Sequence, residues 1–91
     1  LILKGAIGGK KFENVITDVF SPAPFTSARN IRSTINEKVN RKQQANTIVL
    51  NMADNETSSA DLARVIQAEP IPNLQDVIIL RNGVAHLLIW D

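Results

Sequence analysis

The stretch that decides the fold is residues 18–50, DVFSPAPFTSARNIRSTINEKVNRKQQANTIVL. It opens on Asp18-Val19-Phe20, the end of a strand-like segment, and prolines then end the strand because proline cannot donate to a ladder. A basic, amide-rich run follows over 28–44, and an apolar run rich in Ile and Val begins at 47. This order predicts a strand, a turn, a helix and a second strand parallel to the first.

The helix expected over 28–44 has one apolar face. Its apolar residues recur at spacings of three and four positions: Ala28, Ile31, Ile35 and Val39. Thr26 or Ser27 is placed to cap the start of the helix. At about 100° per residue, Lys38 lies roughly 60° from Ile35, at the border of the apolar face. We therefore expect the tip of Lys38 to reach the edge of the sheet beneath the helix.

The N-terminal segment predicts a hairpin. Residues 1–7 and 10–20 are rich in strand-forming residues and flank a Gly8-Gly9 turn. The alternation of apolar and polar residues breaks around Asn14, which predicts a bulge or bend in the second strand.

The second half predicts a central strand, a helix and another hairpin. Residues 47–52 suit a strand buried on both faces, Ser58 begins a capping box for a second helix, and an Asn82-Gly83 turn joins strands over 77–80 and 84–90. The predicted order is β-β-α-β-α-β-β. We expect an α/β fold with a mixed sheet that has hairpins at its ends and is flanked by helices.

Length and composition indicate one small globular domain, residues 1–91. Apolar residues make up 44% and charged residues 21%, which excludes disorder by composition. There is no Cys, and no apolar run reaches the ~18 residues of a membrane span. The net charge is only +1, but up to Lys42 there are eight Lys or Arg against three Asp or Glu. Nucleic-acid binding would therefore depend on local clustering of basic residues in the first half.

Asp18 and Lys38 are the leading candidates for a site. As an acid at the end of a strand, Asp18 would bind a metal ion or orient the attacking nucleophile in a nuclease. The alternative is an edge-strand carboxylate or a cap for the Ser21-Pro22 turn. Lys38 would stabilise the charge on a pentavalent phosphate. The alternative is a solvated helix lysine whose stem covers apolar surface.

Basic and aromatic residues supply further candidates. The candidate phosphate contacts on the helix are Arg29, Arg32, Arg41 and Lys42. They spread around the helix instead of forming one stripe, so a solvated surface is the competing interpretation. His86, the only histidine, would act as a general acid or base if exposed, and Trp90 would stack on a base. Their alternatives are a structural histidine and a terminal tryptophan that closes the core.

Several short motifs follow one another in a family-like order and spacing: Asp18-Val19-Phe20-Ser21-Pro22, Arg29-Asn30-Ile31 with Ile35, Glu37-Lys38-Val39 and Gln43, Ile48-Val49-Leu50-Asn51, and Ile71-Pro72-Asn73-Leu74 leading to Val77-Ile78-Ile79. Together they resemble the toxic C-terminal nuclease domain of contact-dependent growth inhibition proteins, specifically the tRNase group. The resemblance covers about residues 10–91, nearly the whole chain.

The resemblance implies a restriction-endonuclease-like fold and cleavage of tRNA in a rival cell, after delivery from the donor cell surface into the target-cell cytoplasm. The family's strand acid falls on Asp18, its catalytic lysine on Lys38, and the polar residue two positions before that lysine on Asn36. Asp18 would also be a metal ligand if a divalent ion such as Mg²⁺ or Zn²⁺ takes part. The implied partners are tRNA, a cognate immunity protein and a translation elongation factor of the target cell.

One motif of the family has no counterpart in this chain. The family carries a Pro-Asp pair at the start of its first strand, whereas no aspartate precedes Asp18 here. Leu1-Ile2-Leu3 begins inside an apolar run, so we expect a C-terminal piece of a longer polypeptide, with a catalytic Asp and a Glu upstream of Leu1. The N-terminal part of the fold would then be missing, and the fragment alone would be inactive.

Two other functions fit the same residues. A metal-dependent DNase would use the same fold, because nothing in the sequence reads the 2′-hydroxyl of RNA. A non-enzymatic protein-binding module would fit the near-neutral charge and the missing first acid. The DNase differs from a tRNase in its substrate, and the binding module would cleave neither nucleic acid.

Overall fold

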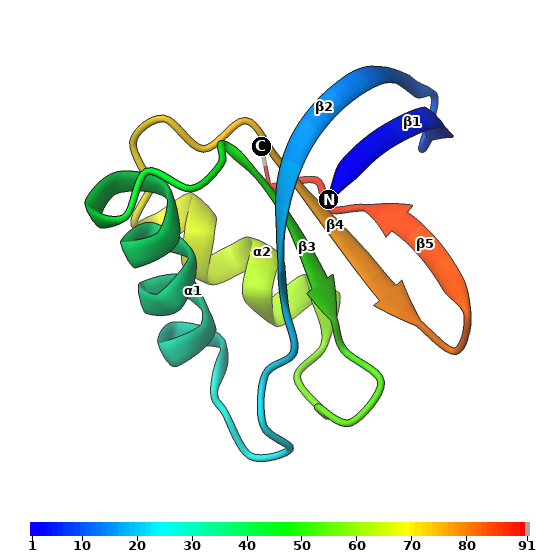
Figure 1. Ribbon diagram of the computed structural model, residues 1–91. Coiled ribbons are helices and arrows are strands. Elements are labelled where there is room, and N and C mark those ends of the chain that lie inside the picture. Colours follow the sequence, from blue (N-terminus) through cyan, green and yellow to red (C-terminus); the bar gives the residue numbers. More distant parts are fainter. Residues whose placement is uncertain (91) are drawn as a thin grey trace.

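Five strands and two helices follow one another in the computed structural model, which describes residues 1–90 (Figure 1). The elements are β1 (Ile2–Ile7), β2 (Lys10–Phe20), α1 (Ala28–Asn36), a π-helical turn η1 (Glu37–Arg41), β3 (Thr47–Asn51), α2 (Ser59–Ala68), β4 (Asp76–Arg81) and β5 (Val84–Leu87). The expected β-β-α-β-α-β-β order is confirmed. Within the described residues, no helix is long and apolar enough to cross a membrane.

The sheet is mixed, and its strands lie in the order β1-β2-β3-β4-β5. β2, β3 and β4 are parallel, whereas the end pairs β1-β2 and β4-β5 are antiparallel. Each parallel connection carries a helix and moves one strand further in the same direction. Right-handed crossovers that move in one direction place their helices on the same face. Figure 1 shows α1 and α2 together on one side of the sheet.

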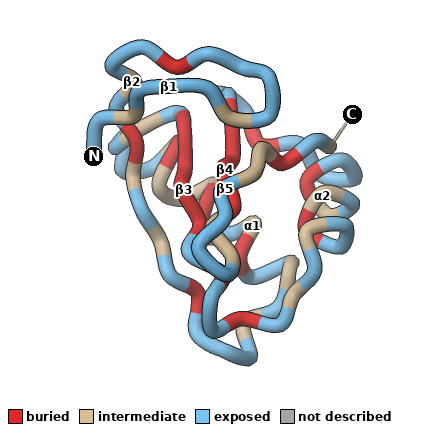
Figure 2. The backbone as a smooth tube through the Cα atoms, turned by 90° about the vertical axis from the view of Figure 1, so that its right-hand side faces the viewer, coloured by how far each residue is buried: buried red, intermediate tan, exposed pale blue. Residues whose placement is uncertain are grey.

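The main hydrophobic core lies between the helices and the sheet. It is built from the inner faces of both helices and from alternate residues of the central strands: Ile31, Ile35, Val39, Ile48, Leu50, Leu62, Ile66, Val77 and Ile79. A smaller core lies on the other face, where Phe12 of β2 packs with Val49 and Ile78. Figure 2 shows that buried residues are concentrated in β3 and β4. The expected central strand is therefore confirmed.

The β1-β2 hairpin covers the smaller core by arching over the sheet (Figure 1). Asn14 has a φ of 53° and the β1-β2 register shifts beside it, so the expected bulge is confirmed. At the hairpin turn, a Cβ added to Gly8 would lie 2.8 Å from Leu87 Cβ of β5. A salt bridge of 2.6 Å between Lys10 Nζ and Asp76 Oδ2 ties the same end of the hairpin to β4. The sheet is thus strongly curled.

α1 begins at a predicted cap and ends earlier than expected. Ser27 Oγ accepts a hydrogen bond from Asn30 N, 3.2 Å away. The sequence predicts a helix over 28–44, but the helical turns end at Arg41. The reason is local geometry, because η1 widens the last turn and Gln43 then takes a left-handed φ of 52°.

The last strand is also shorter than expected. Pairing between β4 and β5 ends at Ile78 and Leu87, so the strand expected over 84–90 stops three residues early. The physical reason is core packing: Leu88 and Trp90 turn toward the helix-side core instead of extending the ladder. The Asn82-Gly83 turn itself is confirmed, with φ values of 54° and 75°.

Gly8→Ala tests the closure of the hairpin onto β5, with Gly9→Ala as the matched control. Both positions have positive φ, 60° and 80°, so alanine at either costs about 1–2 kcal/mol of backbone strain. Only Gly8 faces Leu87, so we expect Gly8→Ala to lose roughly 1–3 kcal/mol more through overpacking. Urea unfolding of both variants measures the difference. Equal losses would mean that the hairpin does not press on β5 in solution.

Candidate functional site

Asp18 and Lys38 meet across the interface between helix and sheet. Lys38 Nζ lies 2.8 Å from Asp18 Oδ2. The pair is partly shielded from water, since the Lys38 side chain is 17% exposed and that of Asp18 is 24% exposed. Partial burial lowers the effective dielectric, so the attraction between the charges exceeds that of a surface pair. The expectation that Lys38 reaches the sheet edge is confirmed, whereas a catalytic role for the pair stays a prediction.

The register of β2 orients Asp18 toward the helices. Asp18 aligns with Ile48 and Phe20 aligns with Leu50 in the parallel β2-β3 ladder. Ile48 and Leu50 belong to the helix-side core, and aligned residues share a face, so Asp18 and Phe20 point the same way. Lys38 Nζ lies over the Phe20 ring, 5.7 Å from its centroid. The ammonium is therefore held by a carboxylate and an aromatic face.

Lys38 projects from the π-helical turn η1. Lys42 N donates to Glu37 O, a bond across five residues instead of the usual four. π-Helical turns are rare in proteins, but those that do occur are often found at functional sites. Here the turn keeps Val39 buried while Lys38 stays at the edge of the core. The sequence carries no signal for this turn, because the spacing of apolar residues fits an ordinary helix equally well.

Asn36 is not brought together with the Asp18-Lys38 pair. It precedes Lys38 by two residues, about 200° around a helix. Its Oδ1 accepts a hydrogen bond of 2.8 Å from Asn40 Nδ2. Asn40 in turn bonds to Pro72 O and to Asn73 Nδ2, in the loop before β4. Asn36 therefore helps to hold the end of the helix against residues 72–73.

Two of the candidate phosphate contacts, Arg41 and Lys42, lie at the Lys38 end of the helix. Both are exposed, and Arg41 Nη1 lies 3.5 Å from Glu37 Oε1. Arg29 is also exposed but belongs to the first turn of α1, roughly 18 Å from Arg41 along the helix axis. Arg41 and Lys42 are thus the basic side chains best placed to act together with Lys38.

Arg32 has a different environment from the other basic residues. Its Nε donates to Glu69 O at 2.8 Å and its Nη2 donates to Pro70 O at 3.3 Å. These carbonyls end α2, so the guanidinium joins α1 to the end of the second helix. The structure therefore gives Arg32 a structural role, and its proposed contact with phosphate stays a prediction.

His86 lies on the same face of the sheet as Asp18 but far across it. The aligned row Phe20, Leu50, Ile79 and His86 runs from β2 to β5. Three strand spacings of about 4.8 Å separate its ends by roughly 14 Å. His86 Nε2 lies 3.1 Å from Ser59 Oγ, at the start of α2. This placement fits the structural alternative for the histidine.

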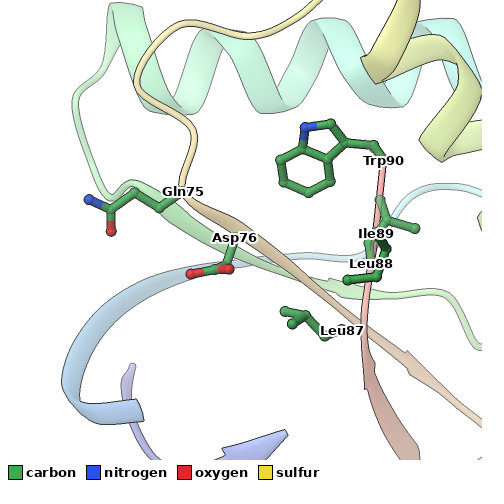
Figure 3. Close-up of a pocket in the computed structure, with 6 residues that line it drawn as sticks. All are labelled: Gln75, Asp76, Leu87, Leu88, Ile89 and Trp90. Atoms are coloured by element: carbon green, nitrogen blue, oxygen red, sulfur yellow. The ribbon is translucent and has the colours of Figure 1, made fainter. Parts of the chain in front are cut away.

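A second lysine-carboxylate pair, Lys10-Asp76, lies on the opposite face of the sheet. Asp76, Leu87 and Trp90 surround a small cavity of about 150 Å³ (Figure 3). Ordinary ligand sites occupy about 300–1,000 Å³, so this cavity is small for a substrate. Trp90 packs against the helix-side core, as its structural alternative predicts. The surroundings of Lys10-Asp76 therefore leave little room for a substrate.

A metal ion would have to be held largely by Asp18 and the substrate. Within residues 1–90, no three His, Cys, Asp or Glu side chains gather as a metal site. Mg²⁺ in phosphate chemistry is often bound by one or two carboxylates together with substrate phosphates. Asp18 fits one such ligand through Oδ1, since Oδ2 accepts from Lys38. The divalent metal stays a prediction.

An open groove beside the pair is the feature that sequence reasoning missed. It has a volume of about 330 Å³ and lies between β2 and the segment 43–47, with Gln75 at its border. The amide-rich run Gln43-Gln44-Ala45-Asn46 was the sequence signal that could have indicated this groove. Gln75 is distant in sequence from these residues. It lies beside them because of the register between β3 and β4.

Comparison with known proteins adds to this geometry. The chain is 39% identical over 74 residues, or 81% of its length, to the tRNA nuclease CdiA-2 of Burkholderia pseudomallei strain 1026b, and it spans 2% of that protein. It is similar in fold to the CdiA-CT/CdiI toxin and immunity complex from Burkholderia pseudomallei, with a TM-score of 0.70 and 29% identity over 94% of this chain and 69% of that chain. No family model matches.

Sequence and fold agree on the class of protein that this chain resembles, the C-terminal toxin domains of contact-dependent growth inhibition proteins. The resemblance inferred from the motifs is thereby confirmed. Within this class, the domain is similar in sequence to CdiA-2 and in structure to a CdiA-CT domain. Its curled mixed sheet and paired helices match that solved structure.

A double-mutant cycle on Asp18→Asn and Lys38→Met tests the ion pair in solution. Each single variant leaves a partly buried charge without its partner, so we expect losses of roughly 1–2 kcal/mol, between the values of surface and buried pairs. The double variant should lose less than the sum of the two. Urea unfolding measures the coupling. Additive losses would mean that the two side chains do not interact in the folded state.

Proposed function

We propose that this domain is an antibacterial toxin that cleaves tRNA, with Asp18 and Lys38 at the point of phosphodiester cleavage. The observation that carries the proposal is the shielded 2.8 Å ion pair on a fold similar to a CdiA-CT domain. The relative with 39% identity is named a tRNA nuclease, which supports RNA as the substrate. We also propose that the domain has a restriction-endonuclease-like architecture.

Lys38 supplies positive charge where cleavage develops negative charge. Attack on a phosphodiester concentrates charge on the phosphoryl oxygens, and a cation already held in place stabilises this state without reorganisation. Asp18 Oδ2 and the Phe20 ring hold the ammonium. Asp18 Oδ1 is left to orient the attacking group or to bind a divalent ion. Asn36 acts as a positioning residue, because its bond to Asn40 supports the helix that carries Lys38.

The RNA footprint extends from Lys38 over the end of the helix. Arg41 and Lys42 are exposed there and would contact phosphates on one side of the cleaved bond. Arg29 would reach phosphates further along the helix. Arg32, whose guanidinium bonds to Glu69 and Pro70 carbonyls, would contribute mainly by keeping the two helices together.

The proposed biological setting is competition between bacteria. The similar structure is a toxin and immunity complex, which supports a cognate immunity protein as a partner of this domain. Delivery from a donor cell into the cytoplasm of a target cell fits the class. Stimulation by a translation elongation factor remains a prediction of the family resemblance.

Lys38→Ala and Asp18→Ala in the full toxin test the assignment. We expect each to lower the rate of tRNA cleavage by at least about 100-fold, the cost of losing a preorganised charge, while binding of the immunity protein persists. Lys10→Ala is the matched control, since it breaks an ion pair of the same type away from the site. Cleavage of tRNA by both site variants at the rate of the control would contradict the assignment.

The substrate and the metal are tested in one assay. The full toxin is incubated with tRNA and with plasmid DNA, each with and without a chelator. We expect tRNA to be cleaved and plasmid to remain intact, and loss of cleavage with the chelator would identify a divalent ion as a component. Cleavage of plasmid alone would favour the DNase, and cleavage of neither, with a co-purifying partner, would favour a binding module.

A further inference from the structure

Half of the residues that line the open groove beside the Asp18-Lys38 pair carry side-chain amides. They come from the segment after η1 and from the residue before β4: Gln43, Gln44, Asn46 and Gln75. All four are exposed. Within the described residues, the hydrogen bonds in this region use backbone groups, such as Gln44 N to Lys38 O and Gln75 N to Asn46 O. The amide groups are thus available for a ligand.

The groove adjoins the cleavage site along β2. Ile16, which lines the groove, precedes Asp18 by two residues and therefore shares its face, about 6.6 Å away along the strand. On the helix side, the Gln44 amide proton bonds to the carbonyl of Lys38 itself. A ligand held at Asp18 and Lys38 would extend into this groove without leaving the surface.

The groove has the size and chemistry of a base-binding site. Its volume of about 330 Å³ falls within the ~300–1,000 Å³ of small-ligand sites. Side-chain amides pair donor and acceptor in one plane and bind base edges, with adenine as the usual bidentate partner of Gln and Asn. Ile16 is 61% exposed and offers an apolar surface to a base plane. Lys42 is exposed and precedes Gln43 in the chain, so we expect it to contact a neighbouring phosphate.

Other amides in the region are occupied differently. Asn40 bonds to both Asn36 and Asn73, and these bonds hold the helix to the loop before β4. Gln75 also borders the small cavity around Trp90, but its side chain extends away from Trp90 (Figure 3). The amides on the groove are therefore separate from the structural network of Asn36, Asn40 and Asn73.

We propose that this groove binds an unpaired nucleobase of the RNA next to the cleaved phosphate, with adenine as the best-fitting base. RNA sequence is read mainly in single-stranded segments, whose bases are splayed out and bound at their edges. Gln44 and Gln75 are the specificity-determining residues, and Ile16 supports the base plane. The inference rests on the proposed function for its choice of RNA as the ligand.

Binding of short homopolymeric RNAs of A, C, G and U to the full toxin tests the groove, in parallel with tRNA cleavage. We expect wild type to bind the adenosine oligonucleotide most tightly. The double variant Gln44→Ala/Gln75→Ala should lose this preference, weaken adenosine binding about tenfold and raise KM for tRNA more than it lowers kcat. Both substitutions keep the backbone bonds, and thermal unfolding checks that the fold is intact.

Two controls separate base recognition from other effects. Lys42→Ala should weaken binding to all four homopolymers by a similar factor, as loss of a phosphate contact does. Gln67→Ala removes an exposed amide on α2 and should change nothing. Wild type binding all four oligonucleotides equally, or the double variant keeping the adenosine preference, would overturn the proposal. If wild type prefers adenosine yet cleaves no tRNA, the base site stands and the nuclease function falls.

Discussion

Burial of one helical stripe against the central strands is the interaction on which the rest of this structure depends. Ile31, Ile35 and Val39 are almost completely buried against the helix-side face of β3 and β4. At about 25 cal/mol per Å² of apolar surface, side chains of this size contribute roughly 1.5–3 kcal/mol each. Their burial fixes the rotation of the helix, and the rotation places the neighbouring Lys38 above β2, within reach of Asp18. The position of Lys38 next to Asp18 is thus a consequence of core packing.

The same packing explains why two similar ion pairs have different surroundings. Lys38-Asp18 lies where the helix ends above the sheet, beside an open amide-lined groove. Lys10-Asp76 lies on the other face, under the curled hairpin, beside a cavity too small for a substrate. Two ion pairs of similar geometry therefore differ in their surroundings: one lies under the hairpin and the other lies beside an open groove. The difference lies in access for a large ligand, which depends on the curl of the sheet.

Much of this architecture was predictable because its signals are local. Apolar spacing predicted the stripe from Ala28 to Val39, Ser27 and Ser58 predicted caps, and Asn82-Gly83 predicted a hairpin turn. The errors came where backbone geometry or tertiary packing overrides the local pattern. The helix expected to residue 44 ends at Arg41 through a π-helical turn, and the last strand ends at Leu87 because the following residues enter the core. Neither effect has a signature in residue type or spacing.

The sequence by itself determined the order of strands and helices and the direction of the crossovers, since each follows from periodicity, turn chemistry and the handedness of the chain. It also placed Lys38 at the border of the apolar stripe, and the order of motifs singled out Asp18 and Lys38 as candidates. Only the tertiary structure decided which other residues join them. It separated Asn36 and His86 from Asp18 and engaged Arg32 with backbone carbonyls. It also brought Gln75 to the groove that Gln44 lines. The physical reason is that strand register and helix rotation place side chains from distant segments on a common face, and both depend on how the whole core packs.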